Sequence, residues 1–219
     1  MSTETDAVRV REFDQDIREK NGVCLIAGFD EAGRGPLCGP VACGACVLPV
    51  DFKCSLIDDS KKLTPKKRAI AESEIKKAAI AWAVEFVFPE EIDRINIYEA
   101  SKVGMERCLK RILEQVKVEY IITDFMKLDT DIPMLAILKG DATSQCVAAA
   151  SILAKTARDE YMDEVAKQYP EYGFAKHKGY PTKLHMEMIR KFGLIPGFYR
   201  LSYRPVQEVL KERGYRKED

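Results

Sequence analysis

The sequence has no apolar run of membrane-spanning length, no internal repeat and no low-complexity segment. It also has no net charge, because 35 Lys and Arg residues balance 35 Asp and Glu residues. Affinity for nucleic acid must therefore come from local segregation of charge. The first 22 residues alternate in charge without an apolar core of their own. We therefore expect neither a signal peptide nor a membrane anchor, and we expect a cytoplasmic protein.

Cysteine occurs in an odd number, which argues against a disulfide framework. The seven Cys residues stand mostly among Val, Ala and Ile, as buried thiols in a reducing compartment do. Cys43 and Cys46 have the spacing of a zinc or redox pair, but no second ligand pair accompanies them. On a strand, this spacing directs the two side chains to opposite faces. Core packing is the expected role of both.

Hydrophobic periodicity predicts an α/β fold. Apolar residues make up 46% of the chain and charged residues 32%, which is typical of a globular domain. We expect strands at 23–29, 41–49, 81–88, 118–123 and 134–141, and helices at about 64–79, 97–116 and 142–167. The early strands favour antiparallel pairing, and the later ones, separated by helices, favour parallel crossovers. The expected architecture is a mixed β-sheet flanked by helices.

Acidic residues stand where predicted strands end or where the long helix begins: Asp30, Glu31, Asp124 and Asp141. Strand ends in α/β sheets commonly build functional sites. Several anions in one cleft repel one another, so such a cluster predicts divalent cations, and oxygen ligands favour Mg²⁺ or Mn²⁺. The alternative for each acid alone is a turn residue or a helix cap, and Asp141 in particular suits the N-cap of the helix behind it.

Five blocks of the sequence together resemble one enzyme family. They are GFDEAGRGPLCGP (28–40), DDSKKLTPKKR (58–68), EIDRINIYEAS (91–101), KGDATSQCVAAASILAKTARD (139–159) and YGFAKHKGYPT (172–182). These blocks are similar to those of type 2 ribonuclease H, ribonuclease HII, and the resemblance covers roughly residues 24–205. It implies a ribonuclease H-like fold. It also implies an endonuclease that cuts the RNA strand of RNA–DNA hybrids and incises duplex DNA on the 5′ side of a misincorporated ribonucleotide.

The resemblance assigns residues to this activity. The acidic tetrad of the family, implied to be catalytic and to bind two Mg²⁺ or Mn²⁺ ions, maps to Asp30, Glu31, Asp124 and Asp141. The implied products carry 5′-phosphate and 3′-hydroxyl ends. The groups that sense the 2′-hydroxyl map to Gly33, Arg34, Gly35 and Tyr180. We hypothesise that Tyr180 packs on the deoxyribose beyond the scissile ribonucleotide.

Residues 172–205 concentrate positive charge and aromatic rings. They hold seven Lys or Arg residues, seven aromatic residues and one acid, Glu187, which suits phosphate contacts and stacking. The alternative is a solvated basic face over a small hydrophobic cluster. Further candidates for substrate binding lie in the matched blocks: Lys61, Ser144, Lys176 and Lys178. The expected partners are RNA–DNA hybrid and ribonucleotide-containing duplex DNA, bound by a monomer.

The chain divides into three expected parts. Residues 1–22 are an N-terminal extension, which we interpret as a loosely attached helix or tail because its apolar positions are too sparse for a core. Residues 23–170 form the catalytic core. Residues 171–219 form a basic and aromatic helical segment, packed on the core, that binds substrate.

Other conspicuous residues have structural interpretations. His177 and His185 stand in no arrangement of base and nucleophile, so we expect them to be structural. Asp159, on the predicted long helix, suits a surface ion pair better than a metal site. The chain departs from the usual family pattern at Phe125 and Pro181, where glycine is common, and at YRLSY (199–203). Phe125 is expected to tilt the carboxylate of Asp124, and Pro181 to stiffen the tyrosine loop.

Two alternative functions stay open on the sequence. One is a catalytically silent protein that binds hybrids, which metal-dependent cleavage would exclude. The other is a DNA nuclease on the same fold, against which the loop implied to sense the 2′-hydroxyl argues.

Overall fold

A mixed five-stranded sheet forms the centre of the computed structural model, which describes residues 3–54, 56–57 and 63–214. The strands are β1 (Ile26–Ala32), β2 (Val41–Val47), β3 (Ala81–Val87), β4 (Tyr120–Asp124) and β5 (Met134–Ile137). Their order is β3-β2-β1-β4-β5. The pairs β1–β2 and β2–β3 are antiparallel, whereas β1–β4 and β4–β5 are parallel. The predicted mixed sheet is confirmed.

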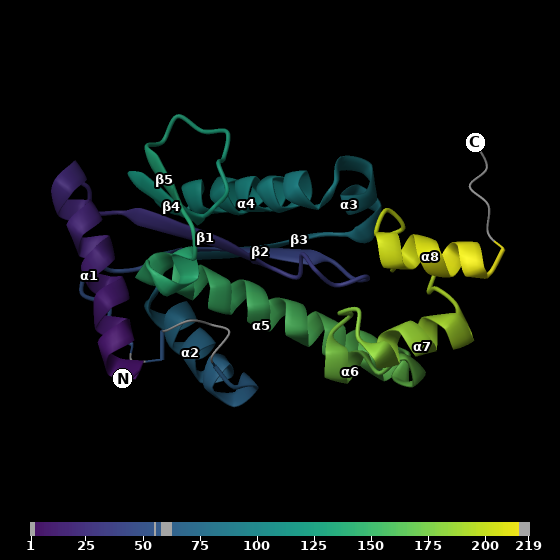
Figure 1. Cartoon of the computed structure of the whole chain (residues 1–219). Helices are drawn as coiled ribbons and strands as arrows, with labels where there is room; N and C mark the ends of the chain where they lie inside the picture. The colour runs from purple at the N-terminus through teal and green to yellow at the C-terminus, as the bar shows by residue number, and fades with distance from the viewer. Residues whose placement is uncertain (1–2, 55, 58–62, 215–219) are drawn as a thin grey trace.

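Helices cover both faces of this sheet (Figure 1). They are α1 (Thr3–Asn21), α2 (Pro65–Ala78), α3 (Pro89–Ile95), α4 (Ile97–Leu113), α5 (Gln145–Gln168), α6 (Phe174–His177), α7 (Lys183–Phe192) and α8 (Arg204–Glu212). One core lies between the sheet and α4 and contains Cys43, and the other lies between the sheet and α5 and contains Cys46. The predicted core packing of both thiols, on opposite faces, is confirmed.

Two glycines let α5 lie against the strands. A Cβ atom on Gly28 would stand 2.2 Å from the main-chain carbon of Cys146, and one on Gly44 would stand 2.3 Å from the carbonyl oxygen of Ala150. Any larger residue would push the helix away from the sheet. All side chains from 145 to 154 are buried. This close packing sets the N-terminal half of α5 beside β1.

The N-terminal helix corrects one expectation. The segment does form a helix, one of the two expected forms, but the helix is not loosely attached, because α1 buries Val10 and packs Phe13 and Ile17 against the core under α5. These three positions recur at the spacing of one helical face. A stripe too sparse to form a core alone is sufficient here, because α2 and α5 supply the remaining apolar surface.

The largest differences from the predicted strand ends lie in β1 and β5. β1 begins at Ile26 and continues to Ala32, because its pairing with β2 extends to Ala32 and Ala42. Two of the predicted site acids therefore lie within a strand, not after it. β5 ends at Ile137, short of the predicted 141. Within the described residues, none of the helices combines the length and apolarity needed to span a bilayer.

The C-terminal segment packs a third apolar cluster against the far half of α5 (Figure 1). This cluster contains Met162 and Val165 of α5 together with aromatic residues of the segment, among them Tyr172, Phe174 and Tyr199. Most of the aromatic rings in 172–205 are therefore core. The hydrophobic-cluster interpretation is correct for them, and the rings that stay exposed are Tyr180 and Phe192.

Candidate active site

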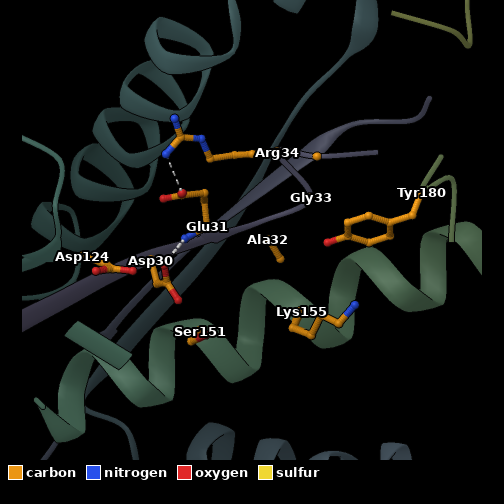
Figure 2. Close-up of a pocket in the computed structure, with 10 residues that line it drawn as sticks. Asp30, Glu31, Ala32, Gly33, Arg34, Asp124, Ser151, Lys155 and Tyr180 are labelled. Carbon is orange, nitrogen blue, oxygen red and sulfur yellow. Dashed lines mark hydrogen bonds and ion pairs between the residues drawn. The ribbon is translucent and has the colours of Figure 1, made fainter. Parts of the chain in front are cut away.

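A pocket opens where β1 leads into the glycine loop, residues 33–35 (Figure 2). Four separate parts of the chain meet there: β1 with the glycine loop, the end of β4, the middle of α5, and the segment after α6. The lining residues are Asp30, Glu31, Ala32, Gly33, Arg34, Gly35, Asp124, Ser151, Lys155 and Tyr180. Three of the four predicted carboxylates and all four predicted 2′-sensing residues thus share one cavity.

The two acids of β1 point to opposite sides of the sheet. Asp30 pairs in register with Gly44, whose face is covered by α5, and Glu31 pairs with Cys43, which packs under α4. On the α5 side, the Ser151 hydroxyl hydrogen-bonds Asp30. On the other side, an Arg34 nitrogen lies 3.3 Å from Glu31 Oε1. Figure 2 shows the two carboxylates on either side of the strand.

Asp124 reaches the pocket from the neighbouring strand. In the parallel pairing of β1 with β4, Phe29 stands opposite Thr123, so Asp124 at the end of β4 lies beside Asp30. Its Oδ1 accepts a hydrogen bond of 3.0 Å from the main-chain N–H of Gly140. Gly140 is the first residue of the 3₁₀ turn Gly140–Ala142, which contains Asp141.

Asp141 is nearly fully buried and is not among the residues that line the pocket. It does not cap α5, because the side chain of Ser144 accepts the hydrogen bond from the Val147 N–H. The helix-cap alternative for Asp141 is therefore wrong. The helix begins three residues later than predicted, after the turn.

The other three carboxylates act electrostatically on Asp30. Burial raises the pKa of Asp30 well above its usual range, and the charges of Glu31, Asp124 and Asp141 raise it further, while the Ser151 hydrogen bond opposes the shift. A divalent cation would relieve this repulsion, and carboxylate oxygens are the donors that Mg²⁺ and Mn²⁺ prefer. The donor set therefore fits such an ion. Among the described residues, however, no three His, Cys, Asp or Glu side chains stand as a ready-made ligand cage.

Two buried arginines lie against the glycine loop, and one of them, Arg200, hydrogen-bonds it. Arg200 donates to the carbonyl oxygens of Gly33 (2.8 Å), Arg34 (2.9 Å) and Gly39 (2.9 Å). Gly33 has φ +97°, and a Cβ there would stand 1.9 Å from Nε of Arg158. The loop thus needs glycine both for its backbone conformation and for the close approach of a guanidinium.

Tyr180 stands over the glycine loop and is 42% exposed. A Cβ on Gly35 would lie 3.3 Å from its ring. The carbonyl of Tyr180 can only accept, so Nδ1 of His185, 3.0 Å away, must donate to it. Burial lowers the pKa of His185 to about 4, which keeps the ring neutral, and its Nε2 then accepts from the Tyr199 hydroxyl. His177 stacks on this ring with centroids 4.4 Å apart, so both histidines are structural, as predicted.

Comparison with known proteins decides the family. The family model described as Ribonuclease HII matches residues 27–206. The chain belongs to the ribonuclease HII family. Ribonuclease HII of Bacillus cytotoxicus is 44% identical over 194 residues, which cover 89% of this chain and 74% of that protein.

Solved structures agree with this assignment. Ribonuclease H2 from Pyrococcus horikoshii OT3 matches with a TM-score of 0.72 and 27% identity, over 86% of this chain and 98% of that one. Bst-RNase HIII in complex with Mn²⁺ has the same fold, with a TM-score of 0.69 and 19% identity over 90% of this chain and 73% of that one. The protein is a ribonuclease H enzyme, an endoribonuclease that acts on RNA–DNA hybrids.

The remaining substrate-binding candidates differ in exposure and in the contacts of their side chains. Lys61 lies outside the described residues. Ser144 is fully buried, and its side-chain oxygen caps α5; its role in substrate binding stays a prediction. Lys178 forms an ion pair with Asp163, and Lys176 is exposed on α6.

Lys155 has a better position than these candidates, because it lines the pocket. It pairs with Asp159 at 2.8 Å, and Asp159 also pairs with Arg68 of α2 at 3.0 Å. The predicted ion-pair role of Asp159 is confirmed.

Three residues of the site were missed on the sequence. Ser151 lies in the block at 139–159, but its position among Ala residues gives no sign of a contact with Asp30. Arg158 and Arg200 look like surface residues in the sequence, although both are fully buried. The only available signal was for Arg158, which lies in the block at 139–159, whereas Arg200 lies in YRLSY (199–203), outside the five blocks.

Proposed function

We propose that the chain incises duplex DNA on the 5′ side of an embedded ribonucleotide, in addition to cutting hybrids, and that two divalent cations held by the four carboxylates serve this reaction. The observation that carries the proposal is that three of the carboxylates line one pocket together with the glycine loop and Tyr180. The charge of Asp141, beside this pocket, also acts on Asp30. Bound Mg²⁺ or Mn²⁺ would supply the Lewis acidity for hydrolysis of the phosphodiester, leaving 5′-phosphate and 3′-hydroxyl ends. The crystal structure of Bst-RNase HIII in complex with Mn²⁺ agrees with this choice of ion.

The residues of the chain divide the remaining tasks. Ser151 orients Asp30, and the Arg34 guanidinium holds Glu31 on the opposite side of β1. Lys155 places a positive charge on the α5 side of the same pocket, where the phosphate backbone of a substrate would lie.

Recognition of the ribonucleotide is assigned to the glycine loop and Tyr180. The glycine loop exposes main-chain groups beside Tyr180, and both border the cavity that contains Asp30. A 2′-hydroxyl bound there would be sensed next to the phosphodiester that is cut, since RNA and DNA differ at that oxygen. Monomeric state, cytoplasmic location and the three-part division of the chain stay predictions.

A labelled duplex with one ribonucleotide tests the proposal. We expect a single cut 5′ to the ribonucleotide in Mg²⁺ or Mn²⁺, none with a chelator, and none in an all-DNA duplex. Binding of hybrids without metal-dependent cleavage would favour the catalytically silent alternative. Cutting of the all-DNA duplex would favour a DNA nuclease.

Tyr180 provides a sharper test of ribonucleotide recognition. We expect Tyr180→Ala to slow cleavage of the single-ribonucleotide duplex at least tenfold. Phe192→Ala is the matched control, because Phe192 is an equally exposed aromatic residue of the same segment that does not line the pocket. A native rate for Tyr180→Ala would show that the assignment is wrong.

A further inference from the structure

Helix α1 precedes the residues matched by the ribonuclease HII model, yet it contacts the segment that follows Asp141. Nη2 of Arg9 donates to the carbonyl of Ala142 at 3.2 Å. Oδ2 of Asp14 accepts from the main-chain N–H of Cys146 at 2.9 Å. Figure 1 shows α1 crossing beside the N-terminal end of α5.

Asp14 is a fully buried carboxylate. Burial raises its pKa, whereas hydrogen bonds from Ser144 and Cys146 and the charge of Arg18 lower it. Withdrawing a carboxylate from water opposes folding, so an apolar side chain would be easier to accommodate at this position. What the carboxylate provides is an acceptor at the start of α5.

The start of α5 needs such an acceptor. Cys146 is the second residue of the helix, and the first amides of a helix have no partner within it. The N-terminal end also has a partial positive charge that a carboxylate stabilises. Asp14 therefore fixes the N-terminal end of α5 through a side chain that belongs to another helix.

The hydrogen bond between Asp14 and Cys146 is linked to Asp141 through the turn that precedes α5. The N–H groups of Thr143 and Ser144 both donate to the carbonyl of Gly140, at 3.0 and 2.8 Å. On its other side, Gly140 donates to Asp124. The turn with Asp141 is thus held by β4 on one side and by α1 on the other, and α1 is itself anchored in the core by Phe13 and Ile17.

We propose that Asp14 is a positioning residue for Asp141, so that the N-terminal helix is part of the support of the active site. Asp14 holds the start of α5, and with it the turn that sets the direction of the Asp141 carboxylate. The proposal rests on the function proposed above for Asp141. It predicts that loss of Asp14 affects turnover and metal use and leaves the binding of hybrid unchanged.

The test compares Asp14→Ala, Asp14→Asn and Asp16→Asn with the native chain, at a temperature where all are folded. Asp16 is the matched control, since it is an exposed aspartate on the same helix. We expect Asp14→Ala to lower kcat about ten- to a hundredfold, as loss of outer support for a metal ligand does. The Mn²⁺ concentration for half-maximal rate should rise severalfold, with KM for hybrid within twofold. Asp14→Asn keeps an acceptor oxygen and should recover part of kcat, and Asp16→Asn should match the native chain.

Native kcat and native Mn²⁺ dependence in folded Asp14→Ala would overturn the proposal, and so would an effect on KM alone. If Asp14→Ala does not fold, Arg9→Gln decides, because Arg9 is exposed and touches the same segment. That variant should lose two- to fivefold in kcat and need more Mn²⁺, and native values would overturn the proposal.

Asp141→Asn separates the failure of the proposed function from the failure of the role of Asp14. A native rate for it removes the proposed role of Asp141, whereas an inactive Asp141→Asn beside a native Asp14→Ala removes only the role of Asp14.

Discussion

The two sides of the pocket differ in how well the protein itself stabilises them. The acidic side consists of Asp30, Glu31 and Asp124, which stand on regular strands beside like charges. The loop side consists of the glycine loop and Tyr180, whose backbone is held by Arg200 and by the stacked histidines. The like charges therefore destabilise the acidic side until a cation binds, whereas the backbone carbonyls of Gly33, Arg34 and Tyr180 on the loop side have donors within the protein. Substitutions on the two sides should change stability in opposite directions.

Asp30→Asn should give the largest effect. Loss of a metal ligand should lower the cleavage rate by more than about a hundredfold, beyond what loss of outer support costs. The melting temperature of the metal-free protein should rise, because removing the buried charge relieves its desolvation and its repulsion by Glu31. Cleavage assays and calorimetry measure the two changes. Asp51→Asn, at an exposed aspartate, is the control. A less stable Asp30→Asn would contradict the comparison.

Arg200→Met should weaken the loop side. It leaves the carbonyls of Gly33 and Gly39 without their buried donor, which should cost about 2–4 kcal/mol of unfolding free energy. The carbonyl of Arg34 loses one donor and keeps the hydroxyl of Tyr203. Cleavage at a single ribonucleotide should fall as well, because the loop loses its support. Urea denaturation and cleavage rates are the measurements. Arg204→Met, at a side chain that is 90% exposed, should change neither, and equal effects at both positions would sink the idea.

His185 should make the stability of the loop side depend on pH. Its pKa in the folded chain is lowered to about 4 by burial, whereas the unfolded chain titrates near 6.5. As the pH falls through this window, the unfolded state binds the proton first, so stability should fall by up to about 3 kcal/mol. His185→Gln has no titratable ring and should lose less stability between pH 7 and pH 4.5 in urea denaturation. Parallel curves for the two proteins would contradict the assignment.

Phe125→Gly should give the smallest effect. Phe125 follows Asp124 with φ +63° and is 55% exposed, so glycine would relieve a left-handed backbone and remove few contacts. We expect a gain of up to about 1 kcal/mol in unfolding free energy and a cleavage rate within about twofold. Lower stability in urea would instead show that the ring packs on the protein.

The acidic side could be predicted from the sequence because its signals are local. Hydrophobic runs lead into Asp30 and end on Asp124, and strand pairing then brings the two together. The family blocks added Tyr180 and the role of the glycine loop in sensing the 2′-hydroxyl. What failed was the detail of strand ends, because continued pairing between β1 and β2 decides that Asp30 and Glu31 lie inside the strand.

The supports of the site could not be predicted because they depend on distant contacts. Arg200 reaches residues more than 160 positions earlier in the chain, and nothing in its neighbours distinguishes it from a surface arginine. The sparse apolar stripe of α1 makes sense only against the surfaces of α2 and α5. Asp14 in turn becomes meaningful only once the start of α5 is placed beside it.

The most direct test of the acidic side is to locate bound Mn²⁺ by anomalous scattering, in crystals of the protein with a non-cleavable hybrid. We expect Mn²⁺ between Asp30, Asp124 and their acidic neighbours, with Glu31 turned away from Arg34 to join them. Mn²⁺ bound elsewhere, or none in the pocket at a concentration that supports cleavage, would contradict it.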